Sequence, residues 1–147
     1  MPYARTDDGV RIYYEEHGRG TPLALAYGIG GNADLWDVNR AALAARHRLI
    51  LWEPRGHARS GSPEDPAKYS FARWTLDLRD VLDQLAIRRA HVGGLSLGAG
   101  IATRFALKYP RRVSSLLSPA SHFANRDQPE AWNRAATEFL ARVDTRR

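Results

Sequence analysis

The fold is decided at residues 93–98, which read GGLSLG and contain the pattern Gly-x-Ser-x-Gly. The bare pattern is common enough to arise by chance in a Gly-rich turn, so its context decides its meaning. Residues 90–94 are short and apolar, as a buried parallel strand is. In residues 99–109, apolar side chains recur at helical spacing until Pro110 stops the helix. Ser96 is therefore predicted to lie on a sharp turn between a strand and a helix.

A turn of this kind makes the Ser96 hydroxyl a candidate nucleophile, because it holds the side chain above the end of the sheet. The helix that follows points its positive amino-terminal end at the same place. Gly94 and Gly98 have a steric reason to flank the serine, since the sharp turn crowds its neighbours and side chains there would clash. The motif thus predicts a nucleophile elbow.

The rest of the chain alternates short apolar runs with amphipathic segments. A tight turn at Asp8-Gly9 predicts a β-hairpin at the amino terminus. The predicted strands are residues 3–6, 10–15, 23–27, 48–52, 90–94 and 113–117, and the predicted helices are a helix capped by Asn32 or Asp34 that runs to about residue 45, and residues 71–86, 99–109 and 130–143. Strands that alternate with helices imply βαβ units and a parallel sheet. We therefore predict an α/β fold.

Composition places the chain among ordinary globular proteins. With 147 residues, 44% of them hydrophobic and 26% charged, it is long enough for one domain. It has no apolar run of membrane-spanning length, and the amino terminus lacks the apolar core of a signal peptide. We therefore expect no membrane association and a cytoplasmic location. Because cysteine is absent, disulfides and thiol catalysis are excluded.

The net charge of +6 does not predict a nucleic-acid partner. Of the 22 basic residues, 20 are Arg and only Lys68 and Lys108 are Lys. The arginines are scattered, with close pairs only at expected element ends or at the terminus. Nucleic-acid binding would need a basic stripe or a reader motif, and neither is found. We expect no nucleic-acid binding.

Three further motifs join the elbow to form a family pattern. They are the loop YGIGG at 27–31, the loop PRGHARSG at 54–61 and the segment YPRRV at 109–113. Together, in this order and spacing, they resemble the amino-terminal half of the α/β-hydrolase superfamily, from about Thr6 to Ser121. Tyr27 stands where the family usually has His, and Glu53 stands near a usual Asp. The elbow resembles the enol-lactonase and carboxylesterase-like branch most closely.

The resemblance implies a three-layer sandwich with a mostly parallel sheet, and a serine hydrolase of small carboxylic esters or lactones. Ser96 would form an acyl-enzyme, and the backbone N–H groups of Leu97 and Ile29 would form the oxyanion hole. Gly28 would let the loop fold close to the substrate. Neither a cofactor nor a metal is expected. Epoxide hydrolase-like and haloalkane dehalogenase-like relatives carry Asp at the position of Ser96, which disfavours those activities.

The remaining triad members are not found in the family's order of Ser, acid and His. The only His after Ser96 is His122, and residues 97–121 hold no Asp or Glu. We therefore expect residues 1–125 to be a partial, truncated hydrolase core and residues 126–147 to begin a lid or cap region. Three alternatives stay open: a form with little or no activity, a non-catalytic fragment or binding module, and one half of a complemented hydrolase.

The remaining histidines are assigned to structural, surface or capping positions rather than to catalysis. His57 is assigned to a structural loop rather than to a general base. His17, His47 and His91 are expected to be surface or capping residues. The strand at 113–117 would be a sheet edge where the family has a covered strand, so we expect self-association through it.

Overall fold

A six-stranded sheet forms the centre of the protein in the computed structural model, which describes residues 2–118 and 124–146. The strands are β1 (Tyr3–Arg5), β2 (Arg11–His17), β3 (Thr21–Ala26), β4 (His47–Trp52), β5 (Ala90–Gly94) and β6 (Val113–Leu117). Their order across the sheet is β1-β2-β4-β3-β5-β6. The amino-terminal pairs, β1 with β2 and β2 with β4, are antiparallel, whereas β4, β3, β5 and β6 run parallel. The predicted hairpin and mostly parallel sheet are confirmed.

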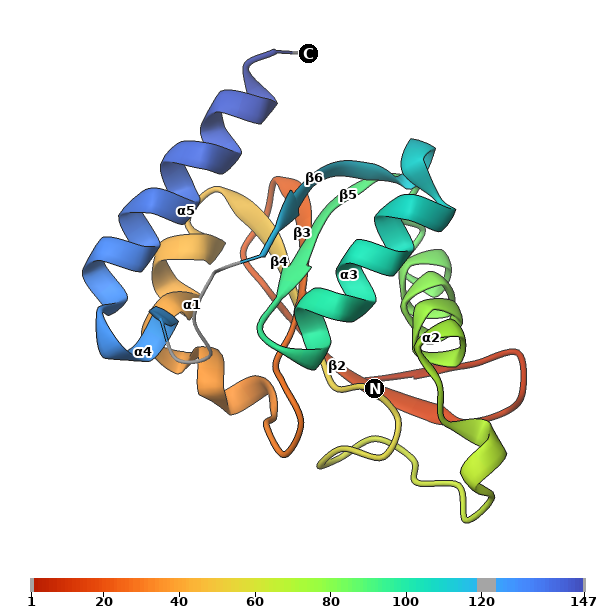
Figure 1. Cartoon of the computed structure of the whole chain (residues 1–147). Coiled ribbons are helices and arrows are strands. Elements are labelled where there is room, and N and C mark those ends of the chain that lie inside the picture. The colour runs from red at the N-terminus through yellow and green to blue at the C-terminus, as the bar shows by residue number, and fades with distance from the viewer. Residues whose placement is uncertain (1, 119–123, 147) are drawn as a thin grey trace.

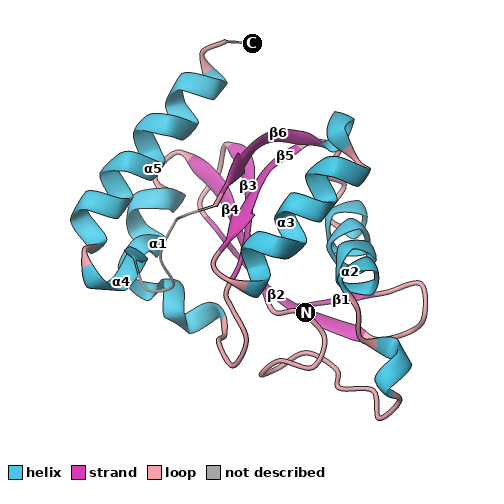
Figure 2. Cartoon of the chain, in the orientation of Figure 1, coloured by secondary structure: helices cyan, strands magenta, loops and turns pink. Residues whose placement is uncertain are grey.

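Helices cover both faces of this sheet (Figures 1 and 2). The α-helices are α1 (Asp37–Ala44), α2 (Phe71–Gln84), α3 (Leu97–Lys108), α4 (Ala124–Asp127) and α5 (Pro129–Asp144), and short 3-10 turns lie at Ala33–Trp36, Pro66–Lys68 and Pro110–Arg112. Helices α2 and α3 lie on one face, and α1 and α5 lie on the other. The predicted three-layer α/β fold is therefore confirmed.

Alternation along the strands separates two hydrophobic cores. In β3, Ala24 and Ala26 face α2 and α3, whereas Leu23 and Leu25 face α1 and α5. Strand β4 repeats this division, because Ile50 and Trp52 join the first core and Leu49 and Leu51 join the second. Successive side chains of a strand point to opposite faces, so the central strands must be apolar on both sides to support two helical layers.

Most boundaries differ from the predicted ones by one or two residues, and two of these differences have identifiable reasons. Strand β3 begins at Thr21, two residues before the predicted start at residue 23. At Pro22 the strand pairs only with β4, because its pairing with β5 starts at Leu23, so the missing N–H of proline is tolerated there. Helix α3 begins at Leu97, directly after Ser96, because only Leu95 and Ser96 connect it to β5.

Helix α5, which was expected to begin a lid region, packs against α1 and the sheet. Its buried residues are Trp132, Ala136 and Leu140, and the Trp132 ring lies 5.7 Å from the ring of Trp36. The lid assignment stays a prediction. Among the described strands, β6 forms the edge opposite β1, as expected. No helix in the described part of the chain is both long and apolar enough to cross a membrane.

Candidate active site

Ser96 occupies a strained backbone conformation at the carboxyl-terminal edge of the sheet. It lies between β5 and α3, with φ 53° and ψ −117°. This is a left-handed conformation that residues other than glycine rarely adopt, and holding such a residue there costs about 1–3 kcal/mol. The residue is exposed, although Leu95 and Leu97 on either side are buried. The turn therefore presents the hydroxyl to solvent above a packed base.

Glycines surround the turn because backbone approaches it from two sides. A Cβ on Gly98 would lie 2.2 Å from the Ala26 carbonyl oxygen, and one on Gly94 would lie 2.3 Å from the same oxygen. A Cβ on Gly28 would lie 2.8 Å from the Cβ of Ser96 and 3.2 Å from its Oγ. Contacts under 3.0 Å with backbone, as at Gly94 and Gly98, cannot be relieved by a side-chain movement, so these two positions are closed to larger residues.

The loop after β3 lies directly beside Ser96. Strand β3 pairs with β5 up to Ala26 and Gly94, and the Leu95 N–H donates to the Ala26 carbonyl over 3.1 Å. A turn closed by the Gly31 N–H and the Gly28 carbonyl then exposes Ile29 to 80%. The structure thus brings the Gly28 loop and the elbow together. The Leu97 N–H is the first amide of α3, so no helical carbonyl is available to it.

Two buried side chains fix the ends of this loop. The carboxylate of Glu53, at the end of β4, accepts hydrogen bonds from the Ala33 N–H over 3.1 Å and from the Arg59 N–H over 2.8 Å. At the other end, the Tyr27 hydroxyl donates to Oδ1 of buried Asn125 over 3.2 Å. Burial raises the pKa of Tyr27, so its phenol stays protonated and can donate. The loop is therefore held by hydrogen bonds on both sides.

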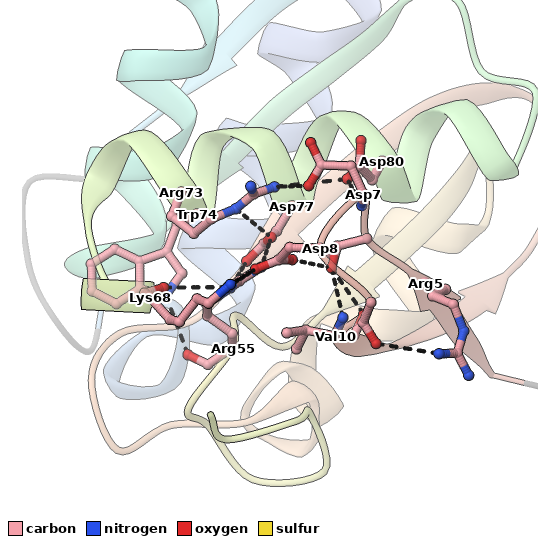
Figure 3. Close-up of polar contacts among 12 residues, drawn as sticks. Arg5, Asp7, Asp8, Val10, Arg55, Lys68, Arg73, Trp74, Asp77 and Asp80 are labelled. Carbon is pink, nitrogen blue, oxygen red and sulfur yellow. Dashed lines mark hydrogen bonds and ion pairs between the residues drawn. The ribbon is translucent and has the colours of Figure 1, made fainter. Parts of the chain in front are cut away.

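A buried arginine fastens the neighbouring loop to the hairpin and to α2. Arg55 is fully buried, and its guanidinium donates to both oxygens of Asp77 over 2.7 and 2.6 Å and to both oxygens of Asp8 over 2.9 and 2.8 Å (Figure 3). It also donates to the Lys68 carbonyl over 3.3 Å. Hydrogen bonds from Arg55 hold the pKa of Asp8 well below its usual range. The loop at residues 53–61 is thus held in place by the hydrogen bonds of buried Arg55.

A general base for Ser96 is not found among the described residues. Within residues 2–118 and 124–146, no histidine nitrogen forms a hydrogen bond with Ser96 Oγ. The Nδ1 of His57 lies 3.2 Å from the Arg55 carbonyl, inside its own loop, which is in keeping with a structural role. His122 lies outside the described residues.

The predicted surface positions of His47 and His91 are wrong, whereas the alternative capping role is confirmed for His47, whose Nδ1 lies 3.1 Å from the Leu43 carbonyl in the last turn of α1. His47 and His91 are buried, and both ring systems face Asp144 at the end of α5. A signal for His47 was present in the sequence, because it is in step with Leu49 and Leu51 on the buried side of β4. The partner Asp144 had no comparable signal, since it comes from a distant helix.

Comparison with known proteins places this geometry in a family. The model of the alpha/beta hydrolase fold matches residues 21–147. The chain is 43% identical over 116 residues to a protein named "Putative carbamate hydrolase RutD" from Azorhizobium caulinodans, with 79% of this chain and 43% of the relative covered. The chain belongs to the α/β-hydrolase family.

Solved structures agree with this assignment. A hydrolase from Pseudomonas aeruginosa PA01 superposes with a TM-score of 0.74 at 36% identity, covering 78% of this chain and 43% of that one. The enol-lactonase from Burkholderia xenovorans LB400 superposes with a TM-score of 0.72 at 27% identity, covering 78% and 45%. The chain therefore spans less than half the length of these relatives.

Proposed function

We propose that this chain carries the nucleophile and oxyanion hole of a serine hydrolase that acts on small esters or lactones. Ser96 Oγ attacks the acyl carbonyl carbon, and the alcohol leaves with a proton, which forms an acyl-enzyme. Water then attacks the acyl carbon and releases the acid and the free serine. The N–H groups of Leu97 and Ile29 are assigned to the developing oxyanion.

The conformation of Ser96 carries this proposal. A strained, exposed serine at the amino-terminal end of a helix has a stability cost that packing alone does not explain. The Gly28 loop approaches the serine so closely that a Cβ on Gly28 would lie 3.2 Å from Ser96 Oγ, where an oxyanion donor is needed. The anchors on Glu53 and Arg55 support the same loops. Backbone donors held in this way need little reorganisation during a reaction.

The substrate class follows from the nucleophile and from the names of the relatives. A serine alkoxide forms a stable bond with an acyl carbon, and it is not the carboxylate that an alkyl-transfer mechanism uses. Carbamates and enol-lactones, which appear in the relatives' names, both contain a carbonyl carbon bonded to a heteroatom. We therefore assign a small carbonyl compound of this kind, with ester or lactone cleavage as the reaction.

The rate of the 147 residues by themselves is expected to be low. Among the described residues no imidazole is placed to take the Ser96 proton, and a serine without its base keeps only the part of the rate that the oxyanion hole supplies. This observation also favours the second candidate, a chain that binds acyl compounds without turning them over.

Hydrolysis of small activated esters and of a γ-lactone tests the proposal. The chain and its Ser96→Ala variant are compared with respect to kcat and KM, with circular dichroism as the control for folding. We expect a slow turnover that the variant loses, with little change in KM. Equal turnover by both proteins would contradict the assignment of Ser96, and saturable binding without turnover would favour the second candidate.

A further inference from the structure

A second cluster of chemically active side chains lies at the end of the sheet where the parallel strands begin, opposite the end that carries Ser96. His47 begins β4, His91 follows the first residue of β5, and Asp144 ends α5. One ligand atom from each of these three residues lies within 4.8 Å of the other two. Since β3, β4 and β5 all begin at this edge, the cluster is separated from Ser96 by the length of the strands (Figure 1).

Strand alternation places both imidazoles on the face that α5 covers. His47 is in step with Leu49 and Leu51, which belong to the core under α1 and α5. His91 lies between Ala90 and Val92, which belong to the other core, so its side chain points to the α5 face. His47 is 3% exposed and His91 is fully buried, and their rings lie 5.8 Å apart and nearly perpendicular. Neither imidazole is therefore on the surface.

The hydrogen bond of the His47 ring at Nδ1 leaves its other nitrogen, Nε2, facing the carboxylate of Asp144. Its Nδ1 lies 3.1 Å from the Leu43 carbonyl, which can only accept, so Nδ1 carries the proton. Nε2 is buried and has no hydrogen-bond partner within the described part of the chain. It lies 3.5 Å from Oδ2 of Asp144. A lone pair and a carboxylate oxygen in this position need a positive charge between them.

His91 also directs one ring nitrogen at the carboxylate of Asp144. His91 Nε2 lies 3.0 Å from Oδ1 of Asp144, while its Nδ1 lies 2.7 Å from Oγ of Ser115, which can accept the Nδ1 proton. Thr21 donates to Oδ2 of Asp144 over 3.2 Å.

We propose that His47, His91 and Asp144 bind one transition-metal dication of the Zn²⁺ type. Two imidazoles and one carboxylate are a donor set that such ions prefer, and each imidazole has the second hydrogen bond that orients metal-bound histidines. Zn²⁺ bonds of about 2.0–2.1 Å place the donors of a tetrahedral site about 3.3 Å apart. His91 Nε2 lies 3.0 Å from Oδ1 of Asp144 and His47 Nε2 lies 3.5 Å from Oδ2, so each imidazole is near this distance from one of the two carboxylate oxygens.

The surface provides an entry path and a fourth position. A cleft of about 660 Å³ between α1 and α5 is lined by His47, Asp144 and Glu138, among others. A water molecule in the cleft can complete the coordination of the ion. Because Asp144 is the last residue of α5, the ion would fasten this helix to the beginning of β4 and β5. We therefore assign the ion a structural role that is independent of Ser96.

Zn²⁺ binding to the untagged chain, measured by titration calorimetry after treatment with a chelator, tests the site. We expect one Zn²⁺ per chain and a higher melting temperature with Zn²⁺ present. The Asp144→Asn variant, which keeps the shape of the side chain, should weaken binding by more than about 100-fold, because even loss of a group behind a ligand costs about 10–100-fold. Ser115→Ala should weaken it by about 10-fold through the orientation of His91.

A matched control is His17→Gln, since His17 pairs with Glu15 on β2, outside the cluster. This variant should bind Zn²⁺ like the parent chain. The competing explanation is an ion pair between a protonated His47 and Asp144. In that case Zn²⁺ binds the parent chain and Asp144→Asn equally and does not change the melting temperature, which would overturn the proposal. Because Zn²⁺ binding is the measurement, the result does not depend on the activity of Ser96.

Discussion

The two ends of the parallel strands differ in the strain and exposure of the residues they carry. At the carboxyl-terminal edge, Ser96 is strained and exposed, and glycines allow backbone to approach it closely. At the amino-terminal edge, His47 and His91 are buried, and hydrogen bonds fix the direction of their rings. Strain and exposure suit a group that reacts, whereas burial and oriented lone pairs suit a group that holds an ion. The two proposed sites can therefore share one sheet, because its ends are separate.

Among changes near the carboxyl-terminal end of the strands, removal of Arg55 should have the largest effect on stability. In Arg55→Met the buried carboxylate of Asp77 loses its bidentate partner, so the free energy of unfolding should fall by about 3–5 kcal/mol. Urea unfolding measures this change. The double variant Arg55→Met/Asp77→Leu should recover part of the loss, because it removes the unpaired charge. A double variant that is less stable than the single one would contradict this account.

Local sequence was sufficient to predict the turn at the carboxyl-terminal end of the strands. The elbow is encoded within residues 93–98, and the bounds of the strand at 113–117 agree with the prediction. The alternation of strands and helices also predicts three layers, since each amphipathic helix needs one face of the sheet. These features depend on neighbours in sequence, so a single chain reveals them.

The cluster at the amino-terminal end of the strands could not be predicted from local sequence. It joins residues 47, 91 and 144, which meet only after α5 has packed. The apolar stripe of α5 fits a lid helix and a core helix equally well, so amphipathicity alone did not determine where it lies. A buried histidine in a strand is visible from alternation, but its distant carboxylate partner is not.

Gly98→Ala should come next in size. Its new methyl group would lie 2.2 Å from the Ala26 carbonyl oxygen, and the free energy of unfolding should fall by about 1–3 kcal/mol. Gly100→Ala is a matched control on the same helix. There the methyl group would meet only the half-exposed Phe71 ring, 2.7 Å away, which can move. Equal destabilisation of both variants in thermal unfolding would show that backbone contact at the elbow is not the cause.

Ser96→Gly should stabilise the protein. Glycine adopts the conformation at φ 53° without strain, and its greater freedom in the unfolded chain offsets part of the gain. The free energy of unfolding should rise by about 1 kcal/mol relative to Ser96→Ala, which lacks the hydroxyl but keeps the strain. Denaturant unfolding of the two variants gives the difference. If Ser96→Gly were the less stable variant, the strain argument would fail.

Asp8→Asn should destabilise the protein by an amount that depends on pH. Because Arg55 lowers the pKa of Asp8 in the folded state, the carboxylate stabilises the fold at every pH above its unfolded value of about 3.9. This contribution is lost as the pH falls through the folded pKa. The stability difference between the parent chain and the variant should therefore be constant near neutral pH and shrink in acid. A difference that grows in acid would contradict the sign.

The most direct test of the central claim is mass spectrometry of the chain after reaction with a fluorophosphonate. We predict one phosphonyl group on the peptide that contains Ser96, and none on that peptide in Ser96→Ala. The oxyanion hole should support this reaction even where hydrolysis is slow. Labelling of another serine, or equal labelling of the parent chain and the variant, would contradict the assignment of Ser96 as the nucleophile.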